Sequence, residues 1–142
     1  MKNFANKTFI IAEAGINHNG DINQAIKLID IASEACADAV KFQTFKTENL
    51  VIKNAPKIAY QEKQNTFKES QFDMLQKLEL SWDDFRKLFN YANSKKIKFM
   101  STAFDSISLN FLINDLGLNL LKIPSGEITN GPFLLEHAKS KC

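Results

Sequence analysis

Residues 39–44, Ala39-Val40-Lys41-Phe42-Gln43-Thr44, are a short run in which apolar and polar side chains do not alternate cleanly. This pattern favours a buried strand of a parallel sheet over a half-exposed antiparallel strand, because both faces of a parallel sheet are covered. Three other runs have the same character, at residues 8–12, 98–102 and 118–123. The sequence therefore predicts four strands.

Helical patterns separate these runs. Apolar side chains recur at helical spacing from Ile22 to Cys36, and Asp21 or Asn23 is suited to cap that helix. Further helices are predicted from the residues at their ends, which are Ser81 for a helix at 82–92, Asp105 or Ser106 for one that ends at Gly117, and Pro132 for one at 133–139.

The predicted order alternates strand and helix, which implies a parallel sheet with right-handed crossovers. Four such units make half of a (β/α)8 barrel, and they are also enough for a small open sheet. The chain stops in or just after a helix, so we expect residues 1–142 to be the truncated N-terminal part of a longer protein.

A long polar connection, residues 45 to about 70, follows the second predicted strand and is rich in Lys, Gln, Asn and Glu. A connection of this length is uncommon in a compact domain and is often functional. It belongs to the face of a parallel sheet on which active sites lie. A short helix at about 69–80 is predicted to close it.

The composition excludes several classes of protein. The 142 residues are 44% apolar and carry a net charge of only +2, with the basic residues scattered, which argues against a nucleic-acid partner or an acidic membrane surface. No apolar run reaches the roughly 18–20 residues of a membrane span, and no signal peptide is evident. Cys36 and Cys142 fit neither a disulfide framework nor metal-ligand spacing. We therefore expect a cytoplasmic location.

Charged and hydroxyl residues recur where each predicted strand ends. They are Glu13 after the first strand, Lys41 and Gln43 on the second, Ser101 and Thr102 on the third, and Lys122, Ser125 and Glu127 on or after the fourth. The carboxyl ends of parallel strands lie at one edge of the sheet, and burying charge there is costly unless it is paired or meets a ligand.

Each of these residues also has a purely structural interpretation. Glu13 and Lys41 suit an ion pair between neighbouring strands, Lys122 could reach water from a strand end, and Thr102 and Ser125 could cap helices. His18 lies in a Gly/Asn-rich turn and is interpreted as a loop residue. Taken together, two lysines and two hydroxyls at one edge suit a small molecule that carries phosphate and carboxylate groups, with a carboxylate opposite them to handle protons.

Four ordered motifs resemble the sialic acid synthase family, which includes N-acetylneuraminate and legionaminate synthases. The motifs span nearly the whole chain and are residues 10–20 (IIAEAGINHNG), 37–44 (ADAVKFQT), 99–105 (FMSTAFD) and 121–127 (LKIPSGE). The first motif has the Gly-Ile-Asn-His form, which favours neuraminate or legionaminate synthases over pseudaminate synthases.

The resemblance implies a TIM barrel of which strands one to four are present here. Members condense phosphoenolpyruvate with an N-acetylated hexose, such as N-acetylmannosamine or a 2,4-diacetamido sugar, to a nine-carbon 2-keto acid and release phosphate. By matching positions, the residues that line the phosphoenolpyruvate pocket are Lys41, Thr102, Lys122, Ser125 and Glu127, with Gln43 beside them. Glu13 faces the aldehyde end of the sugar and serves in proton transfer, and Asn65 corresponds to a sugar-binding asparagine.

The resemblance also implies a divalent metal, manganese or magnesium, and a homodimer at full length. The family's metal ligands are histidines from later strands, and neither His18 nor His137 matches them, so we expect no metal ligand in this chain. The C-terminal antifreeze-like domain is also absent, and the chain alone is expected to be inactive. Two alternatives remain, namely another phosphoenolpyruvate–aldose condensing barrel that makes 3-deoxy sugar acids, and a non-catalytic α/β binding module.

Overall fold

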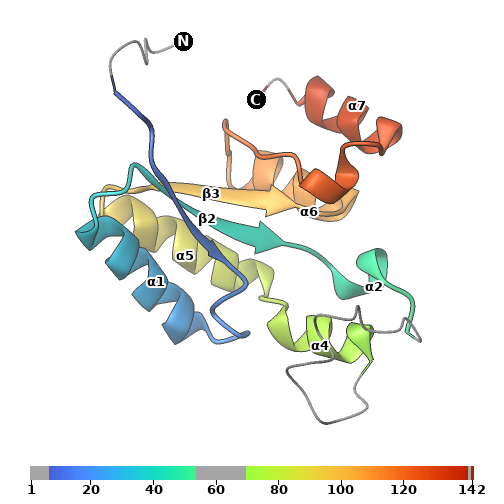
Figure 1. Ribbon diagram of the computed structural model, residues 1–142, viewed down its shortest axis with the longest axis horizontal. Coiled ribbons are helices and arrows are strands. Elements are labelled where there is room, and N and C mark those ends of the chain that lie inside the picture. The colour runs from blue at the N-terminus through green and yellow to red at the C-terminus, as the bar shows by residue number, and fades with distance from the viewer. Residues whose placement is uncertain (1–6, 54–69, 141) are drawn as a thin grey trace.

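The computed structural model describes residues 7–53, 70–140 and 142, and in that part the chain forms a parallel three-stranded sheet (Figure 1). The strands are β1 (Ile11–Gly15), β2 (Ala39–Thr44) and β3 (Lys98–Ala103), and β2 lies in the middle. The parallel sheet is confirmed, and the bounds of the second strand are as predicted. The first strand begins later than predicted.

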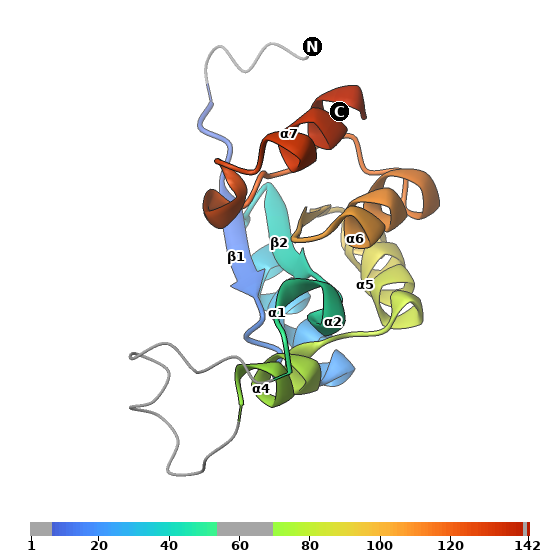
Figure 2. The ribbon, with the colours of Figure 1, turned by 90° about the vertical axis from the view of Figure 1, so that its right-hand side faces the viewer.

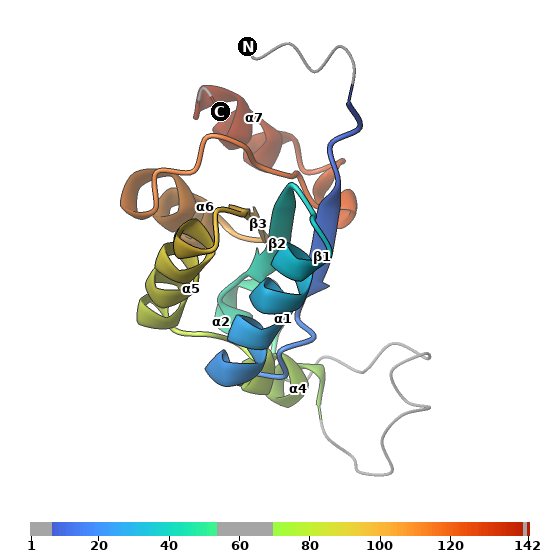
Figure 3. The same ribbon diagram turned by 90° about the vertical axis from the view of Figure 1, so that its left-hand side faces the viewer.

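Two long helices cover one face of the sheet. They are α1 (Ile22–Glu34) and α5 (Trp82–Ser94), which lie side by side (Figure 3). The core forms between them and the strands, where Phe42 stacks on Phe99 with 5.5 Å between ring centroids. Because side chains alternate along a strand, the neighbours of Phe42 in β2, Lys41 and Gln43, are directed to the opposite face.

The remaining helices lie at the ends and edge of the sheet. The helices α2 (Thr47–Leu50) and α4 (Gln71–Leu78) follow β2 and lie at the carboxyl ends of β1 and β2 (Figures 1 and 2). After β3 come α6 (Ser106–Asn110), a π-helical turn (Phe111–Asp115), a 3₁₀ turn (Ser125–Glu127) and α7 (Gly131–Lys139), which packs against α6.

Short polar side chains begin the helices where the sequence predicts. The carboxylate of Asp21 accepts from the Asn23 N–H at 2.8 Å, the hydroxyl of Ser81 accepts from the Asp84 N–H, and Asp105 accepts from the Ser108 N–H at 2.8 Å. Each bond satisfies a backbone donor that has no partner inside its helix. The local signals for these three helices are therefore confirmed.

The fourth predicted strand is wrong, since residues 118–123 form no strand. The Leu118 N–H donates to the carbonyl of Leu112, so the chain there closes the preceding helix. Leu120 and Ile123 are exposed at 37% and 40%. A strand is stabilised by hydrogen bonds to a neighbour, and this segment forms none with β3 among the described residues. Across residues 7–53, 70–140 and 142, no helix has both the length and the apolar character needed to cross a bilayer.

Candidate functional site

Lys41 is the centre of a polar cluster on the sheet. It lies opposite Glu13 in the register of β1 and β2, and the two side chains form an ion pair. The Lys41 ammonium also donates to the Thr102 hydroxyl from β3 at 3.5 Å. The side chain of Lys41 is only 7% exposed, whereas that of Glu13 is 51% exposed. A buried cation therefore lies beside a carboxylate that reaches water.

Gly15 lies between the side chains of Glu13 and Gln43. Gly15 has a φ of +54°, and a Cβ placed on it would lie 3.4 Å from Oε1 of Glu13 and 3.6 Å from Nε2 of Gln43. The Gln43 backbone pairs with Thr102 in the register of β2 and β3. The structure thus brings together four predicted site residues from three strands, namely Glu13, Lys41, Gln43 and Thr102.

The other predicted site residues form no hydrogen bond or ion pair with this cluster among the described residues. Lys122 and Ser125 are exposed, and Glu127 is half-buried and accepts from the side-chain amide of Asn130 at 2.7 Å. Among the described residues, no hydrogen bond or ion pair joins these three to Glu13, Lys41, Gln43 or Thr102. The reason is the missing fourth strand, which leaves residues 121–127 outside the sheet. Asn65 lies outside the described residues.

A hollow of about 540 Å³ contains Glu127 together with Asn49 of α2, Asp105 and Asn130. It lies beyond the carboxyl end of β3, where α2, the start of α6 and the start of α7 meet. Glu127 therefore lies on the carboxyl-end side of the sheet, and among the described residues no hydrogen bond or ion pair joins it to the Lys41 cluster.

His18, interpreted from the sequence as a loop residue, is 1% exposed. Its Nδ1 accepts from the Gly20 N–H at 3.0 Å, which fixes the turn that follows Glu13. Burial lowers the pKa of the imidazole below its usual value, so the ring is neutral at pH 7. The Asn and Gly residues around His18 signal a turn, but nothing in the local sequence signals that the ring is buried.

The described residues do not form a metal centre. No group of three or more His, Cys, Asp or Glu side chains among them could hold a metal ion. His137, the second histidine, is buried on α7, where Nδ1 lies 3.0 Å from the carbonyl of Phe133. Among the described residues, the divalent metal that the resemblance implies therefore has no ligand set.

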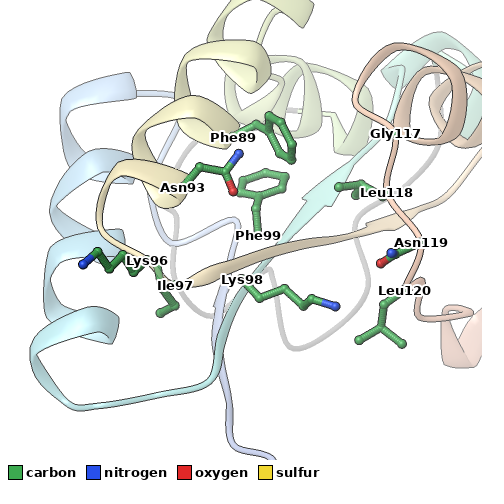
Figure 4. A pocket seen from close by; sticks show the side chains of 10 residues that line it. All are labelled: Phe89, Asn93, Lys96, Ile97, Lys98, Phe99, Gly117, Leu118, Asn119 and Leu120. Atoms are coloured by element: carbon green, nitrogen blue, oxygen red, sulfur yellow. The ribbon is translucent and has the colours of Figure 1, made fainter. Parts of the chain in front are cut away.

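A second hollow, of about 370 Å³, lies at the amino end of β3, the end away from the polar cluster (Figure 4). Its walls include Phe89 and Phe99 on one side and Leu118 and Leu120 on the other, with Lys98 at the strand. It marks the separation between the β3 edge and residues 117–120. It contains none of the predicted site residues, so it is not the candidate site.

The sequence of the chain is similar to one family model and to several proteins with known names. The model of the NeuB family matches residues 28–142. The chain is 53% identical over 133 residues to the N,N'-diacetyllegionaminic acid synthase of Campylobacter jejuni, covering 94% of this chain and 40% of that protein. It is 34% identical over 131 residues to human N-acetylneuraminate-9-phosphate synthase, covering 92% of this chain and 36% of that protein.

A solved structure has the same fold. The N-acetylneuraminic acid synthetase of Leptospira borgpetersenii, determined in complex with citrate, superimposes with a TM-score of 0.77 at 34% identity, over 95% of this chain and 42% of that one. The chain thus spans about two-fifths of the length of the relatives it matches.

Proposed function

The chain belongs to the NeuB family, and from that premise we propose that it supplies the phosphoenolpyruvate-binding part of a sialic-acid-type synthase. The reaction is the condensation of phosphoenolpyruvate with an N-acetylated hexose to a nine-carbon 2-keto acid, with release of phosphate. The relatives named as legionaminic acid and N-acetylneuraminate-9-phosphate synthases support this at the level of the family. The high identity to the former favours a 2,4-diacetamido sugar.

For the fold, the proposal is that residues 1–142 are the first β-α units of a (β/α)8 barrel. Three parallel strands in sequential order with two helices on one face fit the start of such a barrel. The cytoplasm as location and a homodimer as full-length assembly remain part of the same proposal.

The single observation that carries the function is the buried Lys41 ammonium, held by Glu13 and Thr102 at the carboxyl ends of the strands. A cation in a low-dielectric site attracts an anion strongly, since water screens it little. The Thr102 hydroxyl and the Gln43 amide add directed donors, which suit phosphate and carboxylate oxygens. Phosphoenolpyruvate carries both groups.

Lys122, Ser125 and Glu127 are proposed to line the same pocket from residues 121–127. The exposed ammonium of Lys122 and hydroxyl of Ser125 have no hydrogen-bond partner among the described residues and are available to an anion. Asn65 is proposed to bind the sugar.

In the reaction, the terminal carbon of the enol attacks the aldehyde carbon of the sugar, and water then adds to the second carbon of phosphoenolpyruvate as phosphate leaves. Lys41 and Thr102 would hold the anion in place, and Gln43 would orient it. Glu13, which reaches solvent beside Lys41, would hold or transfer a proton at the aldehyde oxygen. Among the described residues no ligand set for a divalent metal is present.

The test is phosphoenolpyruvate binding by the chain, measured by isothermal titration calorimetry. Lys41→Met should weaken binding by about 10- to 100-fold, the range of a charge-assisted hydrogen bond of about 1.5–3 kcal/mol. Lys87→Met is the matched control, because Lys87 is 67% exposed and pairs with Asp84 on α5. Glu13→Gln should bind phosphoenolpyruvate at least as tightly as the wild type, since it removes a competing carboxylate.

Absence of binding by the wild-type chain, or equal binding by Lys41→Met, would reject the assignment. Product analysis on the full-length protein, with N-acetylated hexoses against a phosphorylated pentose, separates the sialic-acid reaction from 3-deoxy sugar acid synthesis. A chain that binds neither phosphoenolpyruvate nor an N-acetylated hexose would favour the non-catalytic binding module.

A further inference from the structure

Lys46, two residues beyond the end of β2, contacts three separate parts of the chain. Its backbone N–H donates to the carboxylate of Asp105 at 2.9 Å, at the turn between β3 and α6. Its ammonium donates to Glu79 at 2.7 Å, between α4 and α5, and lies 4.2 Å from the ring centroid of Trp82. Nothing in the sequence motifs marks Lys46 for such a role.

The carboxylate of Glu79 accepts three hydrogen bonds. One carboxylate oxygen accepts from the Lys46 ammonium, and the other accepts from both the backbone N–H and the hydroxyl of Thr47, each at 2.9 Å. The side chains of Lys46 and Glu79 are both 22% exposed. Burial raises the pKa of Glu79, but the bonds from Lys46 and Thr47 lower it by more, so the pKa lies below its usual value. The carboxylate is therefore charged at neutral pH.

The two residues complete a helix start that the local sequence leaves open. Lys46 is the N-cap of α2 and has no side-chain acceptor for the first amides of the helix. Glu79, 32 residues further along the chain than Thr47, supplies the acceptor instead. A helix of four residues is not stable by itself. The position of α2 and of the end of β2 therefore depends on Glu79.

The end of β2 is the part of the strand that carries the candidate site. Gln43 lies three residues before Lys46, and Lys41 five residues before it. The bond from the Lys46 N–H to Asp105 joins the end of β2 to the end of β3, the strand that carries Thr102. A shift of this strand end would change the separation between the Lys41 ammonium and the Thr102 hydroxyl.

We propose that Lys46 and Glu79 are positioning residues that hold the carboxyl end of β2, and with it Lys41 and Gln43, in the geometry that binds the anionic substrate. This inference rests on the proposed function. It assigns to the pair no contact with substrate. Its effect is on the placement of the groups that make that contact, and placement errors of about 1 Å are enough to cost large factors in binding and rate.

The experiment is a double-mutant cycle on phosphoenolpyruvate affinity, with Lys46→Met, Glu79→Gln and the double variant in the full 142-residue chain. Each single variant should bind about tenfold more weakly, and the double variant should be no weaker than the worse single one, because both changes break the same contact. Lys87→Met, which breaks an exposed ion pair of α5, should bind as the wild type does. Lys46→Arg, which keeps the charge, should recover most of the affinity.

A purely structural role gives a different result. The melting temperature would then fall while the affinity per folded molecule stayed at the wild-type value, and that outcome overturns the inference. Affinity losses that multiply in the double variant also overturn it. If Glu79→Gln does not fold, Thr47→Val removes one hydroxyl donor only, and an affinity equal to that of the wild type would count against the proposal.

A failure of the proposed function and a failure of the positioning role of Lys46 and Glu79 give different results. A wild-type chain that does not bind phosphoenolpyruvate overturns the proposed function and this inference with it. A chain that binds, loses binding in Lys41→Met and keeps it in Lys46→Met overturns this inference alone.

Discussion

Replacement of Gly20 by alanine should loosen the contact between the β1–α1 turn and α4. Gly20 has a φ of +77°, and a Cβ placed there would lie 2.0 Å from the carbonyl oxygen of Lys77. Cβ atoms essentially never come closer than 3.0 Å to a heavy atom outside their own and the adjacent residues. Since the obstacle is backbone, α4 must move away by about 1 Å for alanine to fit.

The expected loss has two parts. The left-handed backbone costs a residue with a Cβ about 1–2 kcal/mol relative to glycine. The displaced contact adds to this, because α4 has no buried residue of its own to hold it and the helix depends on what touches it. Together these give a loss of about 2–4 kcal/mol in the free energy of unfolding, or a local detachment of α4.

Two other glycines separate these parts. Gly117 has a φ of +65°, but a Cβ placed on it would have no neighbour within 4 Å among the described residues, so Gly117→Ala should cost only about 1–2 kcal/mol. Gly126 has no positive φ and, in the part of the chain that the structure describes, no neighbour within 4 Å of an added Cβ, so Gly126→Ala should change stability by less than about 0.5 kcal/mol. Urea unfolding followed by the fluorescence of Trp82, the one tryptophan, measures all three.

Amide hydrogen exchange locates the effect. Protection in α4 should fall in Gly20→Ala and stay unchanged in Gly117→Ala. A loss in Gly20→Ala no greater than that in Gly117→Ala, with α4 equally protected, would show that the close approach to Lys77 does not exist in solution.

Three further predictions concern other buried polar groups. The pKa of His18 in the folded chain lies below its unfolded value of about 6.5, so the unfolded chain binds the proton more readily. The free energy of unfolding should therefore fall as the pH drops below that value, and His18→Gln should reduce this pH dependence in urea titrations. Ser101→Ala or Thr44→Val should each cost about 1–2 kcal/mol, since their hydroxyls are 2.7 Å apart and buried, and the double variant should lose less than the sum in thermal unfolding. Asp105→Ala should cost about 2 kcal/mol by urea unfolding, because it removes the cap of α6 and the acceptor of the Lys46 N–H, whereas Asp105→Asn should retain part of both.

The elements that the sequence predicts well are those specified by neighbours along the chain. Asp21, Ser81 and Asp105 each accept from an amide two or three residues further on, so the helix starts follow from local residues. The second strand is predicted to the residue because both its neighbours in the sheet are present. The first strand starts at Ile11, and the residue before it, Ile10, donates its N–H to the Asp38 carboxylate and accepts from the N–H groups of Asp38 and Ala39.

Residues 118–123 show where such reasoning ends. Their apolar character is that of a strand, but strand formation needs hydrogen bonds from a neighbour, and the N–H of Leu118 is donated to Leu112. The same limit applies to the Lys46–Glu79 contact, which joins residues 33 apart across the long connection. Parallel-strand geometry was enough to bring Glu13, Lys41 and Thr102 together, because their places depend only on strand direction and alternation.

The unequal exposure of Glu13 and Lys41 bears on what their pair is for. An ion pair contributes little at the surface, and a fully buried pair must offset the desolvation of both charges. Here only Lys41 has lost its water, while half of the Glu13 side chain remains exposed. On the proposed function, an entering anion meets an ammonium that folding has already desolvated, and Glu13 can turn to water at small cost. The desolvation of the Lys41 ammonium therefore lowers the free energy of unfolding, a loss that the packing of α1 and α5 against the sheet offsets. The binding of the anion then gains the full attraction of the charge without that desolvation cost.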